Sequence, residues 1–67
     1  MSLNYYIQTL DSEKSQQVTF EVYQKLNVAA YSRDRILSRV RHRFGVTLKL
    51  DCTTSFVHYL LSSYANC

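Results

Sequence analysis

The spacing of apolar residues changes along this chain, and the change restricts the folds that it can adopt. Two segments in the first half and one near residue 48 alternate apolar and polar residues, as β-strands with one buried face do. Two other segments repeat apolar residues three or four positions apart, as amphipathic helices do. The order predicted is β-β-α-β-α, with strands at Leu3–Leu10, Val18–Lys25 and Val46–Leu50 and helices at about 32–44 and 54–64.

The predicted elements fit a single compact α+β domain over residues 1–67. A chain of 67 residues with one glycine and no proline is long enough for one small core and has no linker. The polar segment Asp11–Gln17 would join the first two strands into an antiparallel hairpin. We expect a three-stranded, mostly antiparallel sheet, its third strand beside the first, with two helices on one face. The first four elements resemble β-grasp folds in their order, which implies nothing about function.

Positive charge is concentrated in Ser32–Gly45, SRDRILSRVRHRFG. The segment holds five arginines and one aspartate, which gives +4 with histidine neutral, whereas the whole chain carries +3. On the predicted helix, Ser32 or Asn27 would be the N-cap and Gly45 a left-handed C-cap. Charge gathered on one element favours an acidic partner. The residues expected to contact a partner or phosphate are Arg33, Arg35, Arg39, Arg41, Arg43 and His42.

Arginine side chains bind carboxylate and phosphate groups alike, so two kinds of partner are considered. The leading hypothesis is a small non-enzymatic adaptor or inhibitor, of the phage or viral type, bound to an acidic surface of a larger complex, such as one of a host. The alternative is a nucleic-acid-binding protein that contacts the phosphate backbone with the same helix. A solvated helix face without any partner would also suit these arginines. A helix-turn-helix is less favoured, because TFEVYQKLN would have to be helical although Val18, Phe20 and Val22 alternate like a strand.

Two further surfaces are candidates for contact. The predicted open face of the sheet carries Tyr6, Tyr23 and Lys49, where exposed rings can stack on unpaired bases or simply favour strand structure. The segment Cys52–Cys67 contains no charged residue, and its apolar arc is wider than packing on a small sheet requires. We expect a protein interface there, with a second copy or another protein, at Val57, Leu61 and Tyr64; packing within the chain alone is the alternative.

The residue types needed for catalysis or metal binding are not grouped in the sequence. Cys52, His58 and Cys67 lack the close paired spacing of a zinc site, and no glycine-rich phosphate loop is present. The carboxylates are scattered, so no acid–base pair is evident. The two cysteines would lie about 22 Å apart at the ends of one helix, too far for a disulfide. We therefore expect no enzymatic activity, no cofactor, no metal and free thiols.

The beginning of the chain, MSLNYYIQTL, has neither the basic nor the apolar region of a signal peptide. Apolar runs elsewhere are far shorter than the roughly 20 residues of a membrane-spanning helix. The expected location is the cytoplasm of a cell or of an infected host.

Overall fold

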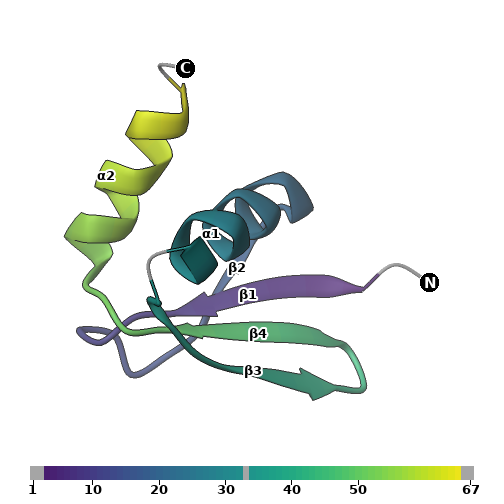
Figure 1. Ribbon diagram of the computed structural model, residues 1–67. Coiled ribbons are helices and arrows are strands. Elements are labelled where there is room, and N and C mark those ends of the chain that lie inside the picture. Colours follow the sequence, from purple (N-terminus) through teal and green to yellow (C-terminus); the bar gives the residue numbers. More distant parts are fainter. Residues whose placement is uncertain (1–2, 33, 66–67) are drawn as a thin grey trace.

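Four strands and two helices make up the part of the chain that the computed structural model describes, residues 3–32 and 34–65 (Figure 1). The α+β class is confirmed, as are elements close to the predicted first strand, last strand and last helix. The sheet has four strands instead of three, and the middle of the chain differs from the prediction. The elements are β1 (Asn4–Gln8), β2 (Gln16–Val18), α1 (Phe20–Ser32), β3 (Ile36–His42), β4 (Gly45–Leu50) and α2 (Thr54–Ala65).

The sheet is mixed, with the strand order β2-β1-β4-β3. The two central strands, β1 and β4, are parallel, and each pairs with an antiparallel outer strand. As predicted, the strand near residue 48 lies beside the first strand, with Ile7 opposite Leu48. Ile7, Leu48 and Leu50 project from these central strands toward the helices and are therefore buried in the core.

Residues 18–25, predicted as a strand, are mostly helix. The N-cap of α1 is Thr19, whose Oγ1 accepts a hydrogen bond from the Val22 N–H at 3.2 Å. The Tyr5 ring of β1 lies 5.0 Å from the ring of Phe20 and 4.9 Å from that of Tyr23, which fixes the start of α1 on the sheet. Burial of the apolar side of this helix therefore outweighs the short alternation of apolar and polar residues that predicted a strand. The buried residues of α1 are Tyr23, Leu26, Ala29 and Ala30.

The segment predicted as an arginine-bearing helix is strand β3, because α1 ends just before it. Asp34 has a φ of 53°, in the left-handed region. Its N–H donates to the Tyr31 carbonyl at 3.2 Å, and the Arg35 N–H donates to the Ala30 carbonyl at 2.7 Å. This pair of hydrogen bonds closes many helices at their C-terminus. Ser32, predicted as an N-cap, is instead the last residue of α1.

A two-residue turn joins β3 and β4 into an antiparallel hairpin. Arg43 and Phe44 form the turn, and Gly45 begins β4 opposite His42. A side-chain carbon at Gly45 would overlap the backbone carbonyl oxygen of Asn4 on β1, and the φ of Gly45 is not positive. Glycine is therefore needed for the close approach of two strands and does not cap a helix.

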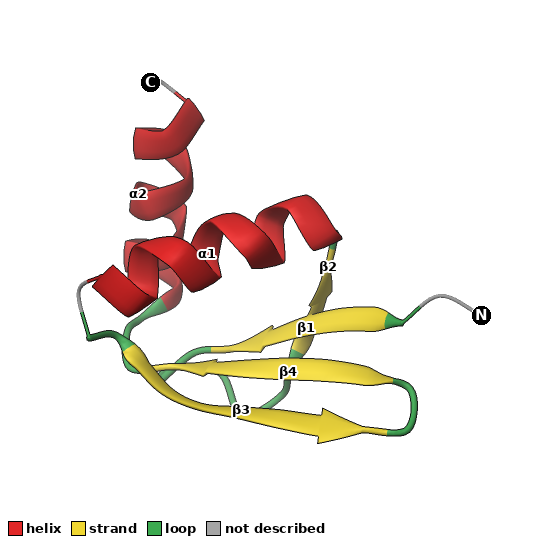
Figure 2. Cartoon of the chain, turned by 45° about the vertical axis from the view of Figure 1, so that its right-hand side comes forward, coloured by secondary structure: helices red, strands yellow, loops and turns green. Residues whose placement is uncertain are grey.

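Both helices lie on the same side of the sheet, as predicted, but only α1 lies along it (Figure 2). Helix α2 rises steeply from the sheet and packs against α1. Val57 and Leu60 are the buried residues by which α2 joins the core. The sheet face away from the helices is open.

The loop that follows β1 holds the start of α2. Thr53 is the N-cap, since its Oγ1 accepts a hydrogen bond from the Phe56 N–H at 3.3 Å. Asp11 Oδ1 accepts three hydrogen bonds of 2.9 Å, from the Thr54 N–H and from the hydroxyls of Thr54 and Thr9. These bonds, the Thr54 N–H first, hold the pKa of the Asp11 carboxyl below its ordinary value.

Candidate binding surface

Strand β3 forms an outer edge of the sheet, and most of the exposed arginines lie on it or next to it. Six of its seven residues are exposed, and only Ile36 is half-buried. Its inner side pairs with β4, and within residues 3–32 and 34–65 no strand pairs with its outer side. An edge strand of this length presents unpaired backbone N–H and C=O groups to its surroundings.

The register of β3 divides its side chains between the two sides of the sheet. Arg39 lies opposite Leu48 and Arg41 opposite Val46, so both arginines are on the helix side. Val40 lies between them on the open side. Because β3 is at the edge, the two arginines are exposed at the flank of the core instead of being buried. Two positions along a strand place them about 6–7 Å apart.

Within the part of the chain that the structure describes, the exposed arginines have no carboxylate partner. In the described residues, the ion pair present joins Lys25 Nζ to Glu21 Oε1 at 3.2 Å, and no arginine takes part. Arg43, in the turn beside β3, has its guanidinium 5.6 Å from the centre of the Phe44 ring. Its hydrogen-bond donors, with those of Arg39 and Arg41, can therefore be used by a partner.

Arg35, predicted as a contact residue, has a structural position instead. Its guanidinium lies 4.6 Å from the centre of the Phe56 ring on α2, a cation–π distance. Its carbonyl accepts a hydrogen bond from the Asp51 N–H at 2.7 Å. Arg35 therefore connects the beginning of β3 with α2 and the end of β4. Arg33 lies outside the described residues.

The open face of the sheet carries Tyr6 and Lys49, as predicted, but not Tyr23. The Tyr6 ring centre is 5.9 Å from that of His42, which alternation places on this face and not with the arginines. Tyr23 is buried in α1 against Tyr5, on the opposite side of the sheet.

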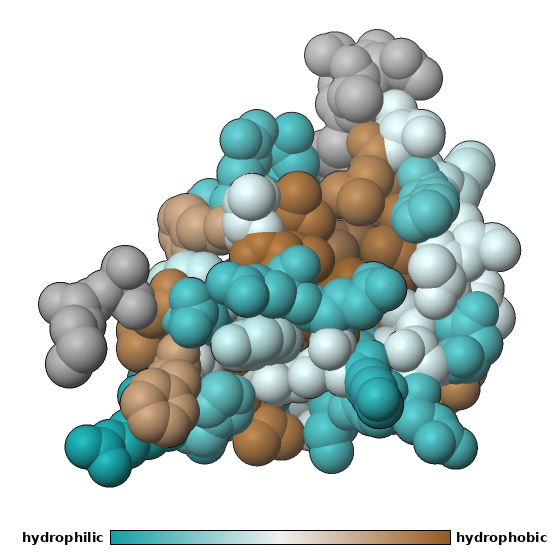
Figure 3. All heavy atoms as spheres, turned by 180° about the vertical axis from the view of Figure 1, so that it is seen from behind, coloured by the Kyte–Doolittle hydropathy of each residue, from teal (hydrophilic) through white to brown (hydrophobic). Residues whose placement is uncertain are grey.

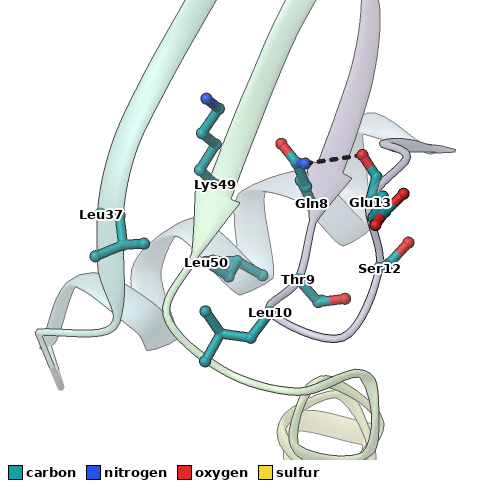
Figure 4. A pocket seen from close by; sticks show the side chains of 8 residues that line it. All are labelled: Gln8, Thr9, Leu10, Ser12, Glu13, Leu37, Lys49 and Leu50. Atoms are coloured by element: carbon teal, nitrogen blue, oxygen red, sulfur yellow. Dashed lines mark hydrogen bonds between the residues drawn. The ribbon is translucent and has the colours of Figure 1, made fainter.

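A shallow hollow lies at one end of the open face (Figure 4). The Gln8 amide donates to the Glu13 backbone carbonyl at 3.1 Å. The Lys49 side chain points away from Thr9 and Leu10. Polar groups therefore do not converge on a common point, so the hollow does not favour a specific small molecule. Its lining residues are Gln8, Thr9, Leu10, Ser12, Glu13, Leu37, Lys49 and Leu50.

Helix α2 leaves less free surface for a protein interface than the sequence predicts. Val57 is only 2% exposed and belongs to the core, which excludes it from contact with a partner. Leu61 is half-buried against the core, and the Tyr64 side chain lies outside the described residues. Tyr59, not predicted as a contact, is 58% exposed. Apolar atoms gather where the two helices meet, as seen from behind in Figure 3.

The described residues include no group of three His, Cys, Asp or Glu side chains that could hold a metal ion. Cys52 is a buried free thiol, and burial raises its pKa although the nearby Arg35 charge acts in the opposite direction. Cys67 lies outside the described residues. No helix in the described part of the chain is long and apolar enough to span a membrane.

No protein-family model matches the chain, and no match was found among curated proteins or among solved structures.

Proposed function

We propose that this chain is a small non-enzymatic binding protein that contacts an acidic region of a partner protein through Arg39, Arg41 and Arg43, the β3 arginine surface. The observation that carries the proposal is the position of these arginines on and beside an exposed outer strand, without carboxylate partners in the described residues. Guanidinium groups bind carboxylates in a planar, bidentate manner. A protein of this size suits an adaptor or inhibitor that occupies an acidic surface of a larger complex.

The distribution of rings and cations supports a protein partner over a nucleic acid. Proteins that bind single strands place aromatic rings and cations along one groove, so that bases and phosphates are contacted together. Here Tyr6 and His42 are on the open face, whereas Arg39 and Arg41 are on the helix side. A single-stranded nucleic acid that stacks its bases on these two rings would lie on the open face. Its phosphates would then be on the opposite side of the sheet from Arg39 and Arg41.

A nucleic acid remains the second candidate, because Tyr6 and His42 lie 5.9 Å apart on an uncovered face. Lys49 on the same face supplies one cation. In this case the open face would be the site, and replacing Tyr6 would weaken binding more than replacing the arginines.

A charge-reversal experiment separates these candidates. The Arg39→Glu/Arg41→Glu variant is compared with Lys14→Glu/Lys25→Glu, which changes the net charge equally at two positions outside both candidate sites. Binding of poly-L-glutamate and of a 20-nucleotide single-stranded DNA is measured at low and physiological salt. We expect the arginine variant to bind polyglutamate at least tenfold more weakly, with an unchanged melting temperature, and the lysine variant to lose less than threefold.

Two results would contradict a protein partner at the β3 arginine surface. One is an equal loss in both variants, which indicates only a response to net charge. The other is tighter binding to the DNA than to polyglutamate, with a loss on Tyr6→Ala. That second result would support the nucleic-acid candidate.

A further inference from the structure

The unpaired edge of β3 lies directly beside the arginines, and this suggests how the partner is bound. Resting on the proposed function, we infer that an acidic segment of the partner adds to β3 as a fifth, extended strand. In a strand whose inner side is paired, every second residue turns its N–H and C=O outward. An added strand satisfies these groups with main-chain hydrogen bonds, and its side chains give specificity.

Length distinguishes β3 from the other edge of the sheet. β2 has three residues and is followed after one residue by α1, so it offers little room for a partner. β3 has seven residues, of which Ser38–His42 pair with β4 without a register shift and span about 16 Å at 3.3 Å per residue. A ladder of several hydrogen bonds can therefore form on β3 only.

The register of β3 predicts the chemistry of the added strand. Residues directly opposite each other in a sheet share a face, so those opposite Arg39 and Arg41 would lie on the helix side. Carboxylates there would meet the two guanidinium groups. In the added strand, the residue between the two acidic ones would lie beside Val40 on the open face, where an apolar, β-branched side chain packs well. The expected partner sequence therefore alternates acidic and apolar residues.

Space for the added side chains is present beside the strand. An open hollow of about 470 Å³ lies between the end of α1 and β3, lined by Tyr31, Asp34, Ile36 and Arg39. It is on the helix side, since Ile36 lies opposite Leu50 and Arg39 opposite Leu48. A side chain from the added strand can enter the hollow without displacing the core.

Charge disfavours a second copy of this chain as the occupant. Antiparallel pairing of two β3 strands around Val40 would place Arg39 of one copy opposite Arg41 of the other. Like charges directly opposite one another destabilise a strand pair. The same arginines attract an acidic strand, so the edge is selective for a partner of opposite charge.

A pair of peptides tests the alternation. The probes are capped eight-residue peptides, one alternating Glu and Val and the other with four Glu followed by four Val, and their binding to the full chain is measured by calorimetry. Strand addition predicts that the alternating peptide binds at least tenfold more tightly. It also predicts that the Arg39→Gln/Arg41→Gln variant loses this preference while Lys14→Gln/Lys25→Gln keeps it.

N-methylation of the alternating peptide tests the backbone pairing directly. One version is methylated on every Glu nitrogen and the other on every Val nitrogen, so charge and side chains are equal. In the added strand, either the Glu or the Val N–H groups would face β3. The peptide methylated on the nitrogens that face β3 should lose binding, and the other peptide should keep it. In the complex, amide exchange should slow in residues 36–42.

The outcomes separate this inference from the proposed function. Equal binding by all peptides, lost in the arginine variant, would overturn strand addition but leave the acidic partner supported. Protection on the open face or on α2 would overturn strand addition as well. No binding by any peptide, together with no binding of polyglutamate, would overturn both.

Discussion

At the scale of single residues, Gly45 is the position that the strand arrangement restricts most. A side-chain carbon there would overlap the Asn4 carbonyl oxygen, in the backbone of a neighbouring strand that cannot rotate aside. We expect Gly45→Ala to lower the free energy of unfolding by at least about 2 kcal/mol, in the range of severe backbone strain. Urea denaturation measures it, with Ser38→Ala on exposed β3 as a control that changes stability by less than about 0.5 kcal/mol. A loss below about 1 kcal/mol would contradict the close approach of the two strands at this position.

Asp11 makes stability depend on pH at the acidic end. Its hydrogen bonds with Thr54 and Thr9 favour the carboxylate and lower its pKa in the folded chain. Their stabilising effect is complete above the ordinary carboxyl pKa of about 3.9 and is lost as the pH falls through the lowered value. The stability difference between the natural chain and Asp11→Asn should therefore be constant above about pH 5 and shrink below pH 4. Thermal melts of both chains from pH 2.5 to 7 test this, and a stability difference that stays constant down to pH 2.5 would contradict it.

At the scale of elements, the segments predicted correctly are those whose surroundings match their pattern. β4 alternates because one side of a central strand faces the core, and Val46, Leu48 and Leu50 are buried. α2 has a cap at Thr53 and an apolar side at helical spacing. In these segments, local sequence and tertiary packing favour the same structure.

For the two elements in the middle of the chain, the sequence predicted a strand where the structure has α1 and a helix where it has β3. Both errors have physical reasons. β3 is an exposed edge strand, so no buried face imposes alternation on it. Ile36, Val40 and Phe44 happen to be four residues apart, which imitates a helix. The turn before Gly45 contains Arg and Phe, not the Asn-Gly or Asp-Gly that marks most two-residue hairpins. Val18, Phe20 and Val22 alternate with polar residues around the start of α1, and the helix signals there are Thr19 at the N-cap and Glu21 in the first turn.

A substitution at Thr19 therefore tests whether the segment that follows it is a helix or a strand. As the N-cap of α1, its hydroxyl satisfies the Val22 N–H. Thr19→Val removes that hydrogen bond while improving strand propensity, so we expect a loss of about 1 kcal/mol in urea denaturation. Thr19→Ser, which keeps the hydroxyl, should stay within about 0.5 kcal/mol of the natural chain. A Val variant as stable as the natural chain would indicate a strand at this position.

At the scale of the whole molecule, the sequence located the charge correctly along the chain but not in space. Arg39, Arg41 and Arg43 are exposed, whereas Arg35 packs on Phe56. On a helix, Arg35, Arg39 and Arg43 would form one outward row, whereas on a strand neighbouring residues point to opposite sides. His42 is therefore separated from Arg41. An error of element type thus becomes an error in the grouping of site residues.

The core also joins the segment after β1 to the segment between β4 and α2, where Cys52 lies. The reactivity of the Cys52 thiol therefore measures whether these segments stay together. Its carbonyl accepts a hydrogen bond from the Leu10 N–H at 2.9 Å, and its thiol is buried with a raised pKa. The thiolate is the reactive form, so both burial and the raised pKa slow modification. In a Cys67→Ser chain at pH 8, we expect a disulfide reagent to react at least 100-fold more slowly with the folded than with the denatured protein.

Across a urea titration, the amount of thiol labelled in a short pulse should follow the loss of circular dichroism, because β1, β4 and α2 must separate before the thiol is exposed. Labelling that precedes this loss would mean that α2 detaches while the sheet persists.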